Sequence, residues 1–297
     1  MEKKIKIQFA IAVILTLLTA QVYSQGIYFA VSAGYGLPAA PNAFKASNYS
    51  YTLNSTGHTS SFEIVKGTGS FGKGFQAGGT FGYMFNENVG AELGLSYLSG
   101  ADMTGNYSES NSSTTFPHSS TQENTLSGNM LRISPALKIA AGEGKIKPYM
   151  KAGLVVGMSP KVIETSFRTD INNGIGSKTE MEIVYSGGTP IGFTGSLGAD
   201  FKLNDRISIF FEFNMIAQSW APKKGIMTKY TEDGVDQLPD MDTNEKEVEF
   251  VDSYTESSST NNTYNAQSPS KELKVFLPFS SAGAKVGLQF ALGKQSK

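Results

Sequence analysis

Near its end the chain reads Ala282-Gly283-Ala284-Lys285-Val286-Gly287-Leu288-Gln289-Phe290-Ala291-Leu292. Alternate side chains of an extended strand point to opposite faces, so this stretch has one apolar face and one polar or small face. The apolar face suits lipid, and the other face suits a barrel interior filled with side chains. Only five residues follow, so we expect an earlier strand to pair with its free edge. A strand of a soluble β-sandwich alternates in the same way, so the pattern alone leaves both architectures open.

Residues 1–24 have the features of a secretory signal peptide. Lys3, Lys4 and Lys6 form a basic start, residues 9–18 are apolar apart from one threonine, and residues 22–24 fit a cleavage site. The apolar run is shorter than the roughly 20 residues that a membrane-spanning helix needs. We therefore expect export through the general secretory route and a mature domain of residues 25–297.

The composition of the mature chain limits its partners. It carries 22 basic and 25 acidic side chains, a net charge of −3, which argues against nucleic acid as a partner. It has no cysteine, so disulfides do not stabilise it. No later window is apolar enough for a spanning helix, and in lipid only helices and closed barrels satisfy every backbone polar group. A membrane protein with this sequence must therefore be a barrel.

Eight segments of the mature chain alternate in this way. They cover residues 27–35, 75–85, 89–97, 130–139, 146–156, 191–203, 206–220 and 282–292. Short turns at 86–88, 141–145 and 204–205 alternate with long polar segments at 37–69, 98–123, 158–190 and 221–280. Compact soluble domains rarely contain four structureless loops of this length, whereas outer-membrane barrels do. We predict an all-β fold, an eight-stranded antiparallel transmembrane β-barrel with short periplasmic turns and long extracellular loops.

Aromatic residues lie near both ends of these strands. The long-loop ends carry Tyr35, Phe75, Tyr97, Phe193 and Trp220, and the short-turn ends carry Tyr83, Phe85, Phe201 and Phe290. Amphipathic rings gather where a bilayer meets water, so we expect two aromatic belts on the outer surface. Pro135 lies inside the fourth strand and removes one ladder donor, which predicts a local weakness there.

The pattern resembles the small outer-membrane β-barrels of the OmpA and OmpX type, in the form common in Bacteroidetes-like bacteria. The resemblance covers the whole mature chain, and it is most specific in the closing strand. Lys285, Gly287, Phe290 and Leu292 resemble the signal by which the barrel-assembly machinery recognises its clients. The strand departs from that signal by ending in leucine where an aromatic residue is usual and by continuing to residue 297. The resemblance implies the outer membrane as location, with its lipid and the assembly machinery as partners.

Six charged residues are expected on the inward faces of the strands. They are Glu92, Asp200 and Glu212 against Arg132, Lys151 and Lys285. Eight strands enclose just enough room for side chains, so three acids and three bases predict a neutral, paired plug rather than an open channel. The alternative is an ion path, because ionisable groups inside membrane proteins also line conduction routes.

No catalytic, cofactor-binding or metal-binding residue is assigned. Some similar small barrels modify lipids with a serine and a histidine at the outer rim, but His58 and His118 both lie in Ser/Thr-rich loops that lack a rigid frame. Residues 232–252 carry nine acidic residues and one lysine, yet they lack the spaced ligands of a calcium loop. We interpret this acidic segment as a solvated loop, with calcium binding left open.

The long loops remain as the binding surface. Residues 162–169 and 179–185 still alternate, which predicts a hairpin that rises beyond the membrane, and residues 247–251 and 271–277 suggest a second one. Exposed strand edges of this kind pair with partner strands. We expect a non-enzymatic protein that supports envelope structure or binds a surface ligand or host-cell partner. The alternatives are a lipid-modifying rim enzyme, a narrow porin, and a soluble β-sandwich.

Overall fold

The computed structural model describes residues 26–39, 48–53, 59–65, 69–111, 117–142, 144–255 and 266–292. The expected signal peptide, residues 1–24, and His58 lie outside these ranges. The predicted all-β class is confirmed, because strands dominate the described chain and its only helical elements are η1 (Leu238–Asp240) and α2 (Thr243–Lys246). None of the helices in the described ranges has the length and apolar character needed to cross a membrane.

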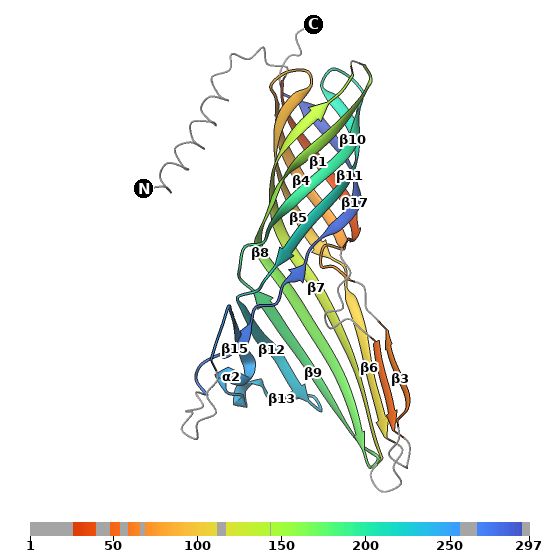
Figure 1. Cartoon of the computed structure of the whole chain (residues 1–297), viewed down its shortest axis with the longest axis vertical. Coiled ribbons are helices and arrows are strands. Elements are labelled where there is room, and N and C mark those ends of the chain that lie inside the picture. Colours follow the sequence, from red (N-terminus) through yellow and green to blue (C-terminus); the bar gives the residue numbers. More distant parts are fainter. Residues whose placement is uncertain are drawn as a thin grey trace.

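Eight strands form a closed antiparallel ring (Figure 1). In ring order they are β1 (Gly26–Pro38), β4 (Gly74–Met84), β5 (Val89–Gly100), β7 (His118–Ala140), β8 (Ile146–Asn172), β10 (Ile191–Lys202), β11 (Ile207–Trp220) and β17 (Ser281–Ala291). β17 pairs with both β11 and β1, and its register with β1 runs from Tyr28 opposite Ala291 to Pro38 opposite Ser281. The expected closure of the last strand against an earlier one is therefore present.

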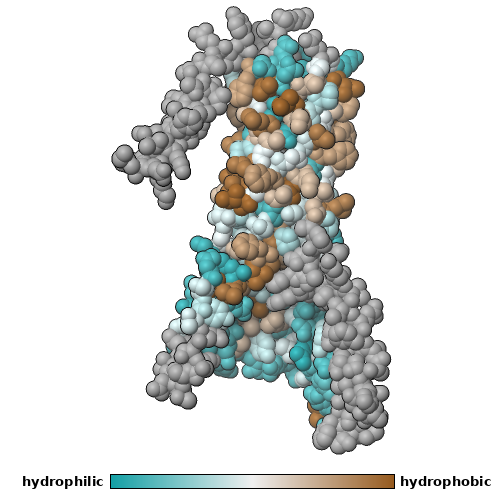
Figure 2. Space-filling view, viewed as in Figure 1, coloured by the Kyte–Doolittle hydropathy of each residue, from teal (hydrophilic) through white to brown (hydrophobic). Residues whose placement is uncertain are grey.

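The outer surface of the ring is apolar. Along β1, Phe29 and Val31 are 41% exposed, whereas Tyr28 and Ala30 between them are buried. β11 repeats the pattern, because Phe213 is 73% exposed while its neighbours Glu212 and Asn214 are buried. Figure 2 shows apolar side chains spread over the ring and mostly polar ones over the opposite end of the molecule. This distribution is typical of a barrel whose ring faces lipid.

The long polar segments are not structureless loops, which corrects the expectation from the sequence. They contain β2 (Asn48–Leu53), β3 (Thr59–Val65), β6 (Met103–Asn111), β9 (Ile175–Ser186) and β12 (Lys224–Glu232). Together with the long ends of β7 and β8 these strands form a sheet that continues beyond the ring, here called the extension (Figure 1). Apart from residues 162–169 and 179–185, most of these segments show no alternation of apolar and polar residues that would mark them as strands in the sequence.

The two hairpins predicted within the long segments have different outcomes. β8 and β9 form the first, joined at Asn173 and Gly174, and it is confirmed. The second is wrong, because β14 (Glu247–Val251) pairs in parallel with β15 (Ser270–Leu273). The connection between them is long enough for the chain to cross back to the same end, as a parallel pair requires. β13 (Val235–Asp236) and β16 (Leu277–Pro278) are short additions to the same region.

Pro135 weakens the ladder of β7 on one side only. β7 stays in register with β5 through Pro135, which faces Leu93. On the other side the paired positions of β7 and β8 pass from Ile133 to Ala136 and omit the two residues between them. The expected local weakness therefore falls between β7 and β8, where the proline nitrogen has no hydrogen to donate.

Three large aromatic side chains inside the ring lie over glycines of neighbouring strands. The cross-strand pairs are Tyr28 with Gly82, Tyr149 with Gly198, and Phe210 with Gly287. A Cβ atom on Gly82 would lie 2.1 Å from Cζ of Tyr28, so the ring occupies the space that a side chain would need. Aromatic side chains that cover cross-strand glycines are a known means of holding strand register.

We expect the Gly82→Ala variant to lose about 1–3 kcal/mol of folding stability, because the new methyl group displaces Tyr28 in a filled interior. Gly94→Ala is the matched control, since the nearest atoms to its Cβ would be 3.6 Å away. Urea unfolding of both proteins refolded in micelles measures the difference. Equal unfolding midpoints for the two variants would contradict the packing argument.

Candidate functional site

The middle of the ring's interior, the lumen, contains a buried charge network centred on Lys151. Nζ of Lys151 on β8 lies 2.8 Å from Oε2 of Glu92 on β5 and 2.8 Å from Oε2 of Glu212 on β11. Lys285 on β17 lies at the margin, with its Nζ 3.5 Å from Oε1 of Glu212. The structure thus brings four of the six expected charges together, although their strands are far apart in the sequence. Each inward position follows from the two-residue alternation of its strand.

Asp200 has a different partner from those expected. Its Oδ2 lies 2.9 Å from Nζ of Lys138, and this nitrogen is also 3.7 Å from Oε1 of Glu92. Lys138 is missing from the set expected from the sequence. It has the same inward parity on β7 as Arg132, but it lies only two residues from the end of that strand. The alternation of β7 could have identified Lys138, because even residues near the end of a ring strand point into the lumen when their parity is inward.

Two tyrosines join the charge network. The Tyr28 hydroxyl donates a hydrogen bond to Oε1 of Glu92, and the Tyr149 hydroxyl donates one of 3.2 Å to Oε2 of Glu212. Nζ of Lys138 also lies 4.2 Å from the centre of the Tyr149 ring, which is within cation–π range. These contacts give the carboxylates and ammonium groups additional partners, as buried ions require.

Arg132 stands apart from the acids. Its side chain crosses the lumen from β7, donates from Nε to Oε1 of Gln218 at 3.1 Å, and donates from Nη2 to the carbonyl oxygen of Phe279 at 3.0 Å. Within the described chain it forms no ion pair, and its Nη1 has no hydrogen-bond partner. With Lys138 and Asp200 paired, Arg132 gives the deeper lumen one cation more than its acids. Lys138 thus adds a base to the three acids and three bases expected from the sequence. The structure also buries a further acid, Glu164, which accepts a hydrogen bond from the Tyr185 hydroxyl of the stopper.

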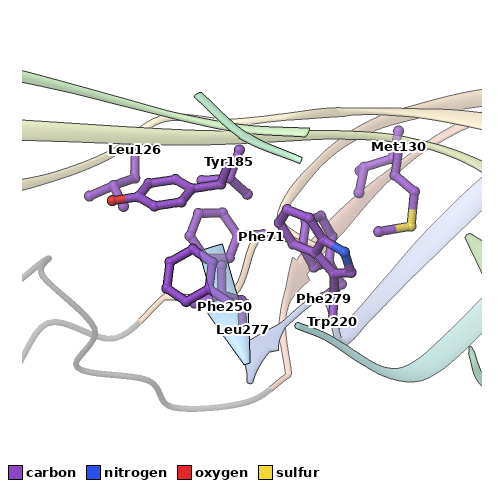
Figure 3. Close-up of a cluster of buried hydrophobic side chains, with 10 residues drawn as sticks. Phe71, Leu126, Met130, Tyr185, Trp220, Phe250, Leu277 and Phe279 are labelled. Carbon is purple, nitrogen blue, oxygen red and sulfur yellow. The ribbon is translucent and has the colours of Figure 1, made fainter. Parts of the chain in front are cut away.

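An apolar cluster closes the lumen where the ring meets the extension, and we call it the stopper (Figure 3). Its buried members are Phe71, Leu98, Leu126, Met130, Val162, Tyr185, Trp220, Phe250, Leu277 and Phe279. Two connecting segments enter the mouth of the ring and supply the rings of Phe71 and Phe279, whose centroids are 5.4 Å apart. The Phe71 amide donates a 2.9 Å hydrogen bond to the carbonyl oxygen of Pro278, which links the two segments.

Trp220 belongs to the stopper rather than to an aromatic belt, which corrects the prediction from the sequence. It is 1% exposed, and its Nε1 donates a 2.7 Å hydrogen bond to the carbonyl oxygen of Gly187. The alternation of β11 explains this position, because Trp220 has the same parity as the buried Glu212 and Asn214. Its place at a strand end suggested a belt, but its parity decides that it points inward.

The lumen contains two separate spaces. A cavity of about 80 Å³ lies against the charge network and is lined by Glu92, Lys151, Glu212 and Lys285 together with hydroxyl-bearing residues. A vestibule of about 720 Å³ opens at the short-turn mouth and is lined by Tyr28, Lys138, Asp200 and several further basic residues. The two spaces share no lining residue. Side chains therefore fill the lumen between them, as expected for eight strands.

The comparisons with known proteins agree with this architecture. The family model described as outer membrane protein beta-barrel domain matches residues 10–219. The chain belongs to this outer-membrane β-barrel family. Its location is accordingly the outer membrane.

Two solved structures, both from Acinetobacter baumannii, resemble the chain weakly. CarO is 14% identical, with 88% of this chain and 96% of CarO covered and a TM-score of 0.29. CarO2 is also 14% identical, with 90% and 99% covered and a TM-score of 0.31. Among curated proteins, no sequence matches this chain.

The residues of the expected assembly signal lie along β17. Lys285 and Gly287 point inward, where Lys285 approaches Glu212 and Gly287 lies beneath Phe210. Phe290 pairs with Phe29 of β1, and Leu292 is 65% exposed just beyond the strand. Recognition of these residues by the assembly machinery stays a prediction.

The candidate catalytic and metal-binding features are distant from the lumen. His118 begins β7 at the far end of the extension, where its Nδ1 lies 2.6 Å from Oδ1 of Asn172 in an exposed contact. Parts of the acidic segment are engaged in structure, since Asp233 accepts a hydrogen bond from the Lys178 amide and Asp252 pairs with Lys274. In the described ranges no group of three His, Cys, Asp or Glu side chains is arranged to hold a metal ion.

Replacing Lys151 by methionine should cost about 3–5 kcal/mol, because it leaves Glu92 and Glu212 buried without their shared cation. Lys202→Met is the control. Its partner Asp205 is 90% exposed at the side chain, so the loss should stay within about 0.5 kcal/mol. Guanidinium unfolding in micelles measures both losses. The triple variant Glu92→Gln, Lys151→Met, Glu212→Gln should recover much of the stability, and a Lys151→Met loss as small as that of the control would contradict the network.

Proposed function

We propose that the protein is a closed, non-enzymatic outer-membrane barrel that holds a rigid sheet outside the cell for contacts with the envelope or with a surface partner. The observation that carries this proposal is the unbroken course of β7 and β8 from the ring into the extension. β8 has 27 residues, whereas about 9–11 residues of a tilted strand cross a bilayer. More than half of β8 therefore lies beyond the hydrocarbon core.

The proposed orientation follows from the two ends of the ring. The eight strands of the ring cross the membrane, the short turns lie in the periplasm, and the extension lies outside. The described chain begins and ends at the short-turn mouth, because Tyr28 pairs with Ala291. Export of residues 25–297 after removal of a signal peptide at 1–24, insertion by the barrel-assembly machinery, and contact of the apolar ring with lipid are parts of this proposal.

Two features of the extension favour a role in surface interaction. Among the described strands β3 pairs only with β2, and β15 pairs only with β14, so each ends the described sheet with an edge to which a partner strand can add. A shallow polar groove of about 350 Å³ is lined by Gln122, Arg168, Asp170, Tyr230 and neighbouring residues. The Arg168 guanidinium donates two hydrogen bonds to Asp170 and holds the pKa of that carboxyl below its usual range.

The proposal is non-enzymatic because the groups that chemistry would need are not assembled in the described ranges. His118 contacts an asparagine at an exposed site, and no catalytic serine is hydrogen-bonded to it in the part of the chain that the structure describes. A general base requires a nucleophile within hydrogen-bond reach and a third group that orients it.

We expect a cysteine at position 175 to react on intact cells with a maleimide polymer too large to enter the periplasm. Ile175 is 76% exposed at the tip of the β8–β9 hairpin, and the protein has no native cysteine. Asp205→Cys is the matched control at a short turn, where the side chain is 90% exposed. It should react only after the outer membrane is permeabilised. Labelling of position 205 alone on intact cells would show the opposite orientation and would contradict the proposed role of the extension.

A narrow pore is the second candidate function, because the vestibule and the cavity follow each other along a polar lumen. The charge network and the stopper both lie across that route, so we expect no discrete conductance steps from the wild-type protein in a planar bilayer. The Phe71→Ala, Phe279→Ala variant should stay closed as well, since the network around Lys151 remains. Reproducible steps from the wild-type protein would favour the pore.

A further inference from the structure

Three buried donor groups at the stopper end of the lumen lack a hydrogen-bond partner in the described chain. They are Nη1 of Arg132, Nδ2 of Asn214 and Oγ of Ser281. Asn214 and Ser281 lie on the paired strands β11 and β17, and Arg132 reaches toward these strands through its bonds to Gln218 and Phe279. A buried donor without an acceptor is destabilising, so three in one region require an explanation.

The same region has a charge excess. Arg132 is 1% exposed and forms no ion pair with any described acid. Lys285 shares Glu212 with Lys151, and it is the more distant of the two cations, at 3.5 Å compared with 2.8 Å. Glu92 and Glu212 therefore face Lys151, Lys285 and Arg132, which is one cation more than acids. The other buried acid near the stopper, Glu164, accepts a hydrogen bond from the Tyr185 hydroxyl and forms no ion pair with Arg132. A buried charge that lacks a partner is strongly unfavourable in a protein interior.

The cavity is lined by neighbours of these three groups rather than by the groups themselves. Ser96, which lines the cavity, is the cross-strand partner of Arg132, and Lys285 lines the cavity directly. Gln76 also lines it, and a Cβ atom on Gly36 would lie 3.0 Å from both Nε2 of Gln76 and Cβ of Ser281. The remaining polar lining near this end consists of hydroxyl and amide side chains. The lining also contains the carboxylates of Glu92 and Glu212, and both of them contact Lys151 at 2.8 Å. Lys285 is therefore the least engaged cation of the cavity.

We propose that the stopper end of the lumen binds one small monovalent anion, of the size of chloride, between Arg132 and Lys285. A single negative charge balances the single excess cation, and an anion accepts hydrogen bonds from donors that otherwise have no acceptor. A cavity of about 80 Å³ has room for such an ion together with several waters. The stopper covers the site and lowers its exposure to solvent, which strengthens the attraction.

Thermal unfolding of the refolded protein in micelles tests the proposal, with sodium chloride or bromide replacing sodium gluconate at constant ionic strength. A ligand that binds only the folded state stabilises it, so the melting temperature should rise by about 3 to 5 °C for each tenfold increase in halide above the dissociation constant. The rise should be absent in Arg132→Gln. It should persist in Lys138→Gln, which removes another buried cation that is paired with Asp200 instead.

Two results would overturn the anion site. One is the same melting temperature in chloride and gluconate for the wild-type protein, which would mean that water alone satisfies the donors. The other is an equal halide response in Arg132→Gln. If that variant does not give the compact gel band of a folded barrel before boiling, Arg132→Lys takes its place, and its halide response should be weakened. Crystals of the wild-type protein grown in bromide are an independent test. An anomalous scattering peak from bromide should lie in the lumen beside Arg132, and the absence of this peak would reject the proposal.

Discussion

The structure depends on the pairing of every backbone polar group within the ring. In hydrocarbon no water is available to an unpaired N–H or C=O group, so a sheet that crosses lipid must have no free edge. The contact of β1 with β17 meets this requirement, and it joins residues from opposite ends of the described chain. The apolar outer face, the short turns and the inward charges are consequences of closing the sheet in this way.

Closure at eight strands leaves an interior that side chains must fill. The protein fills it in three layers along the axis. Tyr28 and Tyr149 lie over glycines near the vestibule, the network around Lys151 occupies the middle, and the stopper closes the far end. The middle layer pairs its ions through residues on several strands, so its stability depends on the register of the whole ring. The stopper comes from connecting segments as well as strands, which is why its aromatic residues show no common period.

The extension forms because the backbone hydrogen bonds between paired strands can continue outside the lipid as well as within it. β7 and β8 leave the membrane already hydrogen-bonded, and further polar strands add to them on both sides. The resulting sheet is stiffer than free loops and presents two edges and a polar groove to the surroundings. A rigid sheet of this kind loses less conformational entropy when a partner binds than free loops would.

The sequence by itself determined the class, the ring strands and the inward face of each ring strand, because a period of two is local and survives any tertiary arrangement. Glu92, Lys151 and Glu212 could be placed inside on that basis. Only the tertiary structure decided which charges pair, since the register between distant strands set Lys138 against Asp200 and left Arg132 beside Gln218. It also decided that, beyond the hairpin of residues 162–169 and 179–185, the polar segments are strands, because their pairing is governed by backbone hydrogen bonds that side-chain polarity does not reveal.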